Sequence, residues 1–224
     1  MVRKTKADAL ITRQKLIDAA IEQFARRGVS DTTLTDIADA AGVTRGAVYW
    51  HFTSKAELFN EMWSQQSPLR DIIKHRLIQD EKENPLAFMR ESFTAALQYI
   101  SRSPKQQALL QILFHKCEFH SEMIPESEIR QKIGFSYEIL HRLLSACITN
   151  GTLPPETNIE LSLLILHSFF SGVVKNWLLS PERFDLYHRA PELVESIMST
   201  LLPHPARQQM NSINSVPVYR AQAV

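Results

Sequence analysis

Apolar residues recur at spacings of three and four along most of the chain, a pattern typical of helices with one buried face. The clearest run extends from residue 9 to 27, and Gly28 then supplies a C-terminal cap. A second run covers residues 34 to 41, and a third, shorter helix is predicted over residues 44 to 50. Hydroxyl side chains between Ser30 and Thr33 suit the cap of the second helix. The pattern therefore predicts a helix, a tight turn and another helix after the first long one.

Prolines divide the rest of the chain into segments of helix length. Ser54 is followed three residues later by Glu57, the arrangement of a capping box, and the helix that begins there is expected to end near Pro68. Further helices fit between the later prolines, because proline suits a first turn and breaks a helix interior. Two of them are predicted over residues 159 to 179 and 192 to 202. The chain shows no convincing strand pattern and only six glycines, so we predict an all-α fold of about nine helices.

Charge is distributed unevenly between the two parts of the chain. Residues 1 to 55 hold nine Lys or Arg against six Asp or Glu, a net charge of +3, whereas the remainder holds sixteen against eighteen, a net charge of −2. Most of the basic surplus lies in the first fifteen residues, where Asp8 is the single acid. A basic N-terminus indicates a polyanionic partner, and a solubilising tail is the alternative.

The cysteines and the apolar segments bear on the compartment. Cys117 and Cys147 lie in apolar helical stretches, and no signal-peptide pattern follows Met1, which favours the reducing cytoplasm. The most apolar segment, residues 161 to 179, is interrupted by a histidine, a lysine and an asparagine. Because these groups make insertion into a bilayer costly, we predict a buried bundle helix and no membrane contact.

The segment from Thr32 to Phe59 has the spacing of a helix-turn-helix. Its apolar residues face inward, and Ala41 with Gly42 lets two helices cross closely through a short turn. The second helix would enter the major groove of DNA by its N-terminal end. There Arg45 can donate two hydrogen bonds to a guanine, and Gly46 lets the backbone approach the DNA. We therefore predict that Arg45 reads sequence.

Other polar residues of this segment suit phosphate oxygens, because they carry hydroxyl, imidazole or ammonium groups. These candidates are Thr33, Thr44, Tyr49, His51 and Lys55. Lys4 and Lys6 are expected to follow the DNA backbone or reach a neighbouring minor groove. The alternative is an ordinary helical hairpin with core aromatics, an interpretation that we expect to hold in part for Trp50 and Phe52.

The segment also resembles the signature of the TetR family of bacterial regulators, TxxxIAxxAGVxxGxxYxHFxxKxxL, and the likeness covers roughly residues 10 to 70. The matching residues are Thr33, Ile37, Ala38, Ala41, Gly42, Val43, Gly46, Tyr49, His51, Phe52, Lys55 and Leu58. Residues 3–14, 114–119 and 176–186 resemble members that repress multidrug-efflux operons. The resemblance implies a homodimer that binds double-stranded operator DNA, represses an efflux-pump operon and is released by bulky hydrophobic or cationic drugs.

These patterns divide the chain into four parts. Residues 1–9 form a basic N-terminal arm, and residues 10–70 form a three-helix DNA-binding domain whose helix-turn-helix motif spans 33–52. A helical bundle for ligand binding and dimerisation follows over residues 71–203. Residues 204–224 lack apolar periodicity and are predicted to be a disordered tail.

The second domain holds more helix than is needed to support a DNA reader, which indicates sensing and dimerisation. Stripes of apolar and aromatic residues over 88–100 and 109–117 suit a drug pocket, and simple core packing is the alternative. The pocket candidates are Trp63, Gln66, Phe93, Phe114 and Trp177. If buried, Glu91, Glu118 or Glu122 would attract a cationic ligand, with a solvated surface position as the alternative.

Two helices have predicted roles in assembly and signalling. The helix over 159–179 is apolar on nearly every face, so with the helix over 192–202 it is predicted to form a two-fold, four-helix interface between subunits. The alternative is a central helix buried within one subunit. The helix from Ser54 to Trp63 touches both domains and is predicted to transmit the ligand signal.

Metal and enzyme chemistry find little support in the sequence. His115, Cys117 and His120 are close along the chain, but residues 115 and 117 would point to different sides of a helix and a fourth ligand is missing. No nucleophile elbow, phosphate loop or pair of zinc-binding histidines is present, so we expect neither an enzyme nor a cofactor. A DNA binder without a ligand is the competing class. It would leave the large apolar domain without a role.

Overall fold

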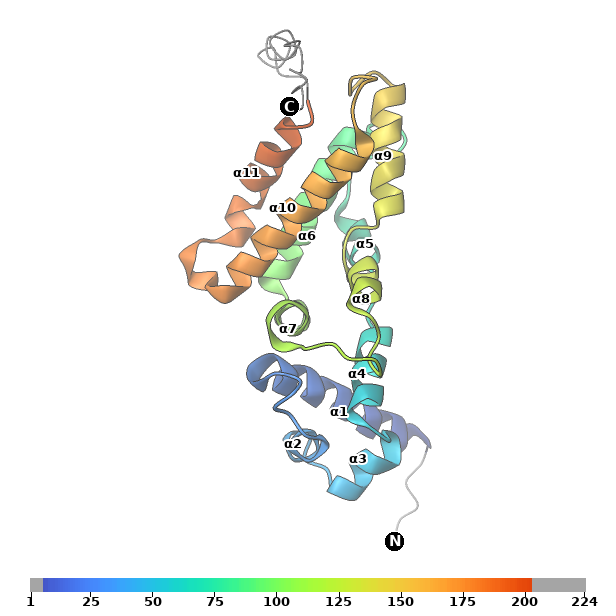
Figure 1. Cartoon of the computed structure of the whole chain (residues 1–224), viewed down its shortest axis with the longest axis vertical. Coiled ribbons are helices and arrows are strands. Elements are labelled where there is room, and N and C mark those ends of the chain that lie inside the picture. The colour runs from blue at the N-terminus through green and yellow to red at the C-terminus, as the bar shows by residue number, and fades with distance from the viewer. Residues whose placement is uncertain (1–5, 203–224) are drawn as a thin grey trace, which may run out of the picture.

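A computed structural model describes residues 6–202, and within that range it contains eleven α-helices, short 3₁₀ and π segments and no strand (Figure 1). The predicted all-α fold is confirmed. The predicted number of about nine helices is too low, because helices as short as the five-residue α5 (Leu69–Ile73) leave no periodic pattern. Residues 203–224, which include the predicted tail, lie outside the described part.

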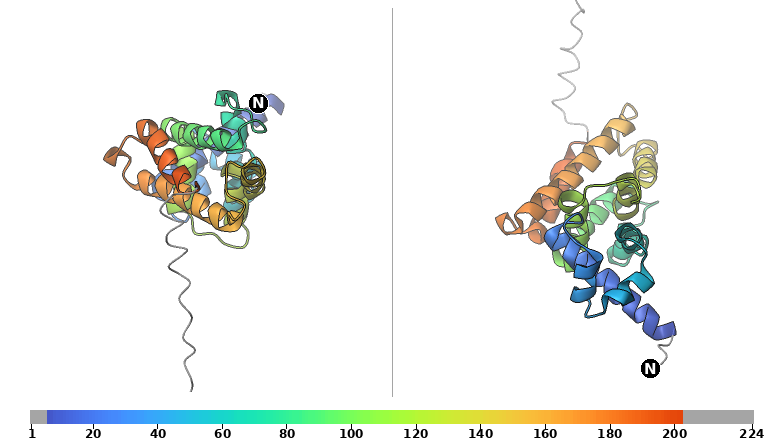
Figure 2. Two further views of the ribbon diagram at one scale, coloured as in Figure 1. Left: turned by 90° about the horizontal axis from the view of Figure 1, so that it is seen from above. Right: turned by 60° about the horizontal axis from the view of Figure 1, so that its bottom comes forward.

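The first helices form a module at one end of the elongated molecule (Figures 1 and 2). They are α1 (Lys6–Arg27), α2 (Leu34–Ala40), α3 (Arg45–His51) and α4 (Lys55–Ser64). Helix α1 begins at Lys6, so residues 6–9 belong to a helix and not to the predicted arm of residues 1–9. The exposed first turn carries Asp8, which interacts favourably with the helix dipole but adds nothing to apolar periodicity.

Local chemistry fixes the ends of α2 and α4. Thr33 caps α2 in a capping box with Asp36, and Gly42 adopts a φ of 66° in the turn to α3, a conformation that favours glycine. Ser54 caps α4 as predicted, but the Glu57 carboxylate accepts from Thr53 N–H at 2.6 Å instead of reaching Ser54. The predicted capping box at Ser54 is therefore shifted by one residue.

The core of this module is fully closed. Phe24, Ile37, Val48 and Phe52 are each 0% exposed. Trp50 is 74% exposed, so the interpretation of this residue as a core aromatic is wrong. Val48 on α3 and Phe52 at its C-cap lie four positions apart on the inner side, which turns Trp50 outward.

The remaining helices form the second domain above this module (Figure 1). They are α5, α6 (Pro85–Arg102), α7 (Pro104–Gln111), the π-helix η2 (Ile112–Lys116), α8 (Glu126–Ile133), α9 (Tyr137–Thr149), α10 (Ile159–Leu179) and α11 (Leu186–Ser199), with 3₁₀ turns at Lys74–Arg76 and Pro181–Arg183. Helix α6 packs against α9 and α11, and α10 lies between α9 and α11. Proline starts α6 and α7, as expected at a first turn.

Helix α11 departs from the prediction of a helix over residues 192–202. It begins at Leu186 and continues through Pro191. Proline cannot donate to the Tyr187 carbonyl, four residues earlier, and the Gln98 amide of α6 donates to that carbonyl at 3.4 Å. A side chain from a neighbouring helix thus partly replaces the missing backbone donor.

Helix α10 has the predicted bounds, and within residues 6–202 it is the one helix long and apolar enough to cross a membrane. One face is buried against the bundle and includes Leu166 and Phe170. Its opposite face leaves Leu161, Leu164 and Leu179 more than half exposed. The expectation of a buried bundle helix therefore holds for one face only.

Candidate nucleic-acid interface and ligand cavity

Helix α3 lies at the end of the molecule (Figure 1). Its outer face presents polar groups. Arg45, Gly46 and Tyr49 are exposed, and the Arg45 guanidinium lies 5.6 Å from the centre of the Tyr49 ring. A Cβ added to Gly46 would meet no atom nearer than the Thr44 hydroxyl, at 4.0 Å. Packing within the chain therefore does not require glycine at position 46. Exposed Trp50 stands beside this face, its ring 4.6 Å from that of His51, and sequence reasoning missed it because aromatic residues are usually buried.

The two candidate threonines act as helix caps. The Thr33 hydroxyl donates to the Asp36 carboxylate at 2.6 Å and accepts from Asp36 N–H at 3.1 Å. The hydrogen bonds from Thr33, together with Arg27, lower the pKa of Asp36 to about 2. The Thr44 hydroxyl accepts from Ala47 N–H at 3.2 Å and retains its own proton for a further bond. Thr44 is thus better placed than Thr33 to bind a phosphate.

Lys55 has a different environment from the one predicted. Its ammonium donates to the carbonyls of Val29 at 2.6 Å, Ser30 at 3.2 Å and Thr32 at 3.0 Å. An ammonium has three donors, so these bonds occupy it fully. These bonds tie Lys55 to the turn between α1 and α2, and the phosphate contact of Lys55 stays a prediction.

Arg13 belongs to the basic surplus of the N-terminus, yet its side chain points into the module. It donates to the His51 carbonyl at 2.8 Å, lies 4.3 Å above the centre of the Phe52 ring and pairs with Glu61 at 3.5 Å. It therefore fixes the end of α3 to α1 and α4. Of the other candidates, His51 is half-buried, Lys6 is exposed at the start of α1, and Lys4 lies outside the described residues.

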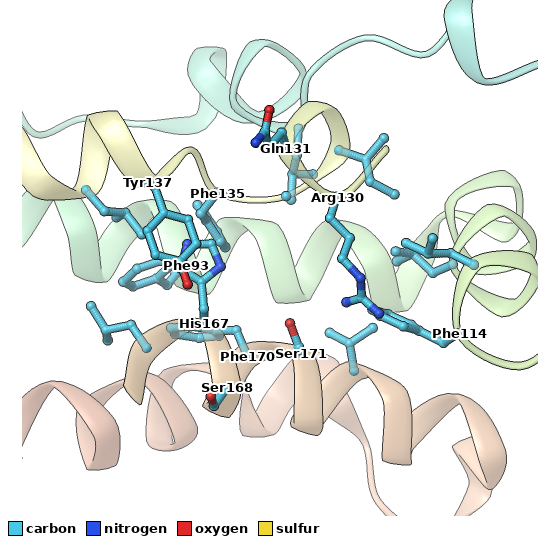
Figure 3. Close-up of a pocket in the computed structure, with 18 of the residues that line it drawn as sticks. Phe93, Phe114, Arg130, Gln131, Phe135, Tyr137, His167, Ser168, Phe170 and Ser171 are labelled. Atoms are coloured by element: carbon cyan, nitrogen blue, oxygen red, sulfur yellow. The ribbon is translucent and has the colours of Figure 1, made fainter. Parts of the chain in front are cut away.

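A cavity of about 480 Å³ opens in the second domain, within the range of pockets for drug-sized ligands (Figure 3). It is enclosed mainly by α6, η2, α8, α9 and α10. The aromatic and polar lining residues are Phe93, Phe114, Ser127, Arg130, Gln131, Phe135, Tyr137, His167, Ser168, Phe170 and Ser171. Leucine, isoleucine and valine side chains complete most of the wall.

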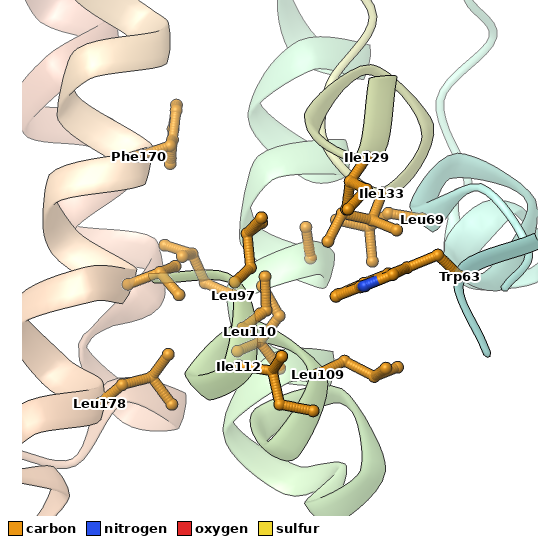
Figure 4. Close-up of a cluster of buried hydrophobic side chains, with 14 of the residues drawn as sticks. Trp63, Leu69, Leu97, Leu109, Leu110, Ile112, Ile129, Ile133, Phe170 and Leu178 are labelled. Carbon is orange, nitrogen blue, oxygen red and sulfur yellow. The ribbon is translucent and has the colours of Figure 1, made fainter. Parts of the chain in front are cut away.

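Two of the five pocket candidates, Phe93 and Phe114, line this cavity. The structure places Trp63, Gln66 and Trp177 elsewhere. Trp63 is 1% exposed and packs among the buried residues between α4, α7 and α8 (Figure 4), and Trp177 is buried on α10. The Gln66 amide turns back to the Met62 carbonyl at 2.5 Å. A stripe of large apolar residues does not by itself separate packed core from cavity wall.

The acidic residues considered for a cationic ligand are absent from the cavity wall. The Glu91 carboxylate accepts from Ile78 N–H and Gln79 N–H, and Glu118 and Glu122 are exposed. Burial, with smaller effects of Glu126 and Glu118, raises the pKa of Cys117 to about 11, so its thiol stays protonated. Among residues 6–202, no three His, Cys, Asp or Glu side chains are grouped as a metal site.

Specific bonds join the module to the cavity domain. Asn60 on α4 donates to the Glu122 carbonyl at 2.9 Å and accepts from Ile124 N–H at 2.7 Å. Lys132 on α8 donates to the carbonyls of Trp63, at 3.1 Å, and Ser64 at the end of α4. Helix α4 is therefore held at two points by the domain that contains the cavity.

Comparison with known proteins agrees with this two-part organisation. Residues 16–62 match bacterial regulatory proteins of the tetR family, and residues 84–203 match the C-terminal region of MAATS-type transcriptional repressors. The chain is 49% identical over 203 residues to the probable acrEF/envCD operon repressor of Escherichia coli strain K12, covering 91% of this chain and 92% of the relative. It is 35% identical over 206 residues to the HTH-type transcriptional regulator AcrR of Shigella flexneri, covering 92% and 96%.

A solved structure gives the same result. NalD, the secondary repressor of the MexAB-OprM multidrug efflux pump in Pseudomonas aeruginosa, is similar with a TM-score of 0.72 and 35% identity, over 88% of this chain and 98% of that one. These relatives are regulators and not enzymes, which confirms the expectation of a non-enzyme. The chain therefore belongs to the TetR family of bacterial transcriptional repressors.

Proposed function

We propose that this protein represses a multidrug-efflux operon in the cytoplasm by binding operator DNA as a homodimer, and that a small hydrophobic compound in its cavity releases the DNA. The names of the relatives support the efflux role. The observation that carries the proposal is the outer face of α3, which is polar and exposed while its inner face is locked in the core. A rigid helix with an open N-terminal end suits the major groove.

Individual residues receive roles from their positions. Arg45 reads a guanine, and Gly46 allows the helix to lie close to the DNA. Thr44 and Tyr49 contact phosphates, as do Lys4 and Lys6 at the basic N-terminus. Lys55, whose ammonium is fully bonded, supports the turn between α1 and α2.

The dimer uses the exposed apolar face of α10 together with α11. These helices lie side by side along one flank (Figure 2), and Leu161, Leu164 and Ile165 are exposed there. A two-fold axis through this flank would hold two α3 helices one DNA turn apart, ~34–36 Å, or a multiple of it. Sedimentation of Leu161→Glu should show a monomer, and Leu161 does not line the cavity. A Leu161→Glu dimer as stable as the wild type would remove this interface.

Release requires the compound to prefer a conformer that does not fit the DNA. Helix α4 is the proposed transmitter, because Asn60 and Lys132 fasten it to the cavity domain. Asn60→Ala should weaken the effect of ligand on DNA affinity and leave ligand affinity unchanged. An unchanged ligand effect would exclude this route.

The test of the proposal is fluorescence anisotropy on the DNA upstream of the protein's own gene. Arg45→Ala should weaken binding by about 1–3 kcal/mol for each bidentate pair of hydrogen bonds that it removes. Arg142→Ala is the matched control, since Arg142 lies on α9, far from α3, where it pairs with Glu81. Binding that survives Arg45→Ala would refute the assignment of α3. Binding that no hydrophobic compound reverses would favour a ligand-independent regulator.

A further inference from the structure

One side chain on the cavity wall carries a permanent charge, and that charge is positive. The wall contains no aspartate or glutamate, and Arg130 is the one permanently charged side chain among the residues that line the cavity. A cationic compound would meet a positive group on this wall and no carboxylate, because Glu126, the partner of Arg130, lies outside the wall. The charge of the wall therefore bears on which ligands the cavity accepts.

Arg130 reaches from α8 into the space beside Phe114 and Ser171 (Figure 3). Its guanidinium lies 4.9 Å from the centre of the Phe114 ring, and its Nε donates to the Glu126 carboxylate at 2.7 Å. Glu126 is one turn earlier on α8 and is not part of the cavity wall. Glu126 accepts from Nε and Nη2 on one edge of the Arg130 guanidinium. The third nitrogen, Nη1, donates to no group among residues 6–202. A planar guanidinium can bind a second anion through its other edge.

The other end of the cavity is aromatic. The Phe93 ring stacks on Phe170 at 4.2 Å and meets Phe135 edge-on at 4.5 Å. Beside them Tyr137 and His167 stack face to face at 3.9 Å. These rings suit a flat apolar body.

His167 adds a polar group but no charge to this aromatic end. Its Nε2 is buried and has no hydrogen-bond partner within the described chain. Burial lowers the pKa of His167, so the ring is neutral at physiological pH. The permanent positive charge is thus confined to the end that contains Arg130.

We propose that the cavity selects hydrophobic anions: an aromatic body lies among Phe93, Phe135 and Phe170, and a carboxylate, sulfonate or phenolate meets Arg130. The regulatory consequence of this assignment rests on the proposed function. The assignment narrows the inducer, expected from the sequence to be hydrophobic or cationic, to hydrophobic anions. The Arg130 side chain is 43% exposed, so water screens part of its charge, and the apolar wall limits this screening on the side that faces the ligand. Glu126 offsets part of the arginine charge and keeps the guanidinium in place.

The test compares three probes with the same rings: 2-naphthoate, neutral 2-naphthalenemethanol and the cation 2-naphthylmethylammonium, each titrated calorimetrically into the full-length protein without DNA. We expect naphthoate to bind at least about tenfold more tightly than the cation, as one charge-assisted hydrogen bond would produce. Arg130→Gln should remove this preference and leave the affinity of the neutral probe nearly unchanged. Arg130→Lys should keep part of it, because the charge remains and the planar fork is lost.

Arg142→Gln is the matched control, because it also breaks an arginine–glutamate pair but lies outside the cavity. Naphthoate preference that survives Arg130→Gln, or a cation that binds as tightly as the anion, would overturn the proposal.

Fluorescence anisotropy on operator DNA separates the proposed anion site from the proposed release of DNA by ligand. Arg130-dependent naphthoate binding that leaves DNA affinity unchanged keeps the anion site and rejects release by ligand. Release of DNA by all three probes alike keeps the regulator and rejects the charge selection.

Discussion

The module of α1 to α4 and the domain above it differ in how tightly their interiors are packed. In the module, buried aromatics are fully enclosed, and polar groups such as Lys55, Arg13 and Asp36 bind defined partners. In the second domain a cavity of about 480 Å³ remains open, and the buried Nε2 of His167 on its wall has no partner among the described residues. Unpaired buried nitrogens are not confined to this domain, since Trp63 Nε1 on α4 also has no partner there, so the difference lies in the open volume. A reader of DNA needs one fixed shape, whereas a sensor of small molecules needs unfilled volume. The difference in packing therefore agrees with the division of labour that we propose.

The largest test of this difference removes one phenylalanine from each region. Phe59 is fully buried between Phe24 and Trp63, so Phe59→Ala should lower the free energy of unfolding by about 3–5 kcal/mol. Phe114 is half-buried and faces a void, so Phe114→Ala should cost less than about half of that. Urea denaturation followed by circular dichroism measures both. Equal losses would mean that the cavity wall is packed as tightly as the module.

Lys55→Met tests whether the polar groups of the module are structural. Losing a charged donor to three carbonyls should lower the free energy of unfolding by about 1.5–3 kcal/mol. The salt dependence of DNA binding should keep its slope, which a phosphate contact would reduce by about 0.9 per phosphate. Lys105→Met, at an exposed position of α7, is the control for loss of charge. A smaller slope in Lys55→Met would support the predicted phosphate contact.

Matched glycine variants compare the two regions at a smaller scale. Gly46 on α3 and Gly172 on α10 are helical and have room for a methyl group, so alanine at either position should stabilise the chain by up to about 1 kcal/mol. Gly46→Ala should nevertheless weaken DNA binding by about tenfold, or 1.4 kcal/mol, because the methyl group meets the DNA. Gly172 lies on the face of α10 that we propose for the dimer, so Gly172→Ala should leave DNA binding unchanged only at protein concentrations at which sedimentation shows an intact dimer. Thermal melts and anisotropy on the same preparations decide this, and unaltered DNA binding by Gly46→Ala would exclude close approach at that residue.

The smallest effect concerns the cap of α2 in acid. The pKa of Asp36 is lowered to about 2 from an ordinary value of 3.8, so the stability that its carboxylate contributes is complete above pH 3.8 and is lost as the pH falls through about 2. Carboxyl NMR should show this titration in the folded protein. Thr33→Val, which removes the hydroxyl donor, should move the pKa of Asp36 upward. A value near 3.8 in the wild type would show that the cap is open in solution.

The sequence predicted the module well because its determinants are local. Thr33, Gly42 and Thr44 define ends and turns within a few residues, and α10 was placed correctly by a long apolar run. The cavity was harder to predict, because its wall comes from elements that are far apart along the chain. Phe93 and Trp63 both lie on apolar helical stripes, yet only the packing of α4 against α8 separates a wall residue from a core residue.

The sequence also does not predict which partners a polar side chain binds or where a helix departs from regular geometry. A lysine at position 55 is compatible with a phosphate or with three carbonyls, and the sequence does not distinguish them. The sequence does not identify Arg130 as a cavity residue, because it lies in a polar stretch that gives no sign of a cavity. The start of α11 was misplaced because the rule against interior proline does not anticipate a donor such as Gln98 from another helix.

The π-helix η2 also sets a requirement on chain length. A π turn holds one residue more than an α turn, and this segment places Phe114 on the cavity while the Lys116 carbonyl accepts from Val29 N–H, at 2.8 Å, in the DNA-binding module. Deleting one residue would let the segment wind as an ordinary α turn, in which the remaining residues are spaced by about 100° and point in other directions than they do in the π turn. Phe114 and Lys116 could not then both keep their contacts. Evolution of new ligand preferences in this protein should therefore tolerate substitutions within residues 112–116 far better than insertions or deletions there.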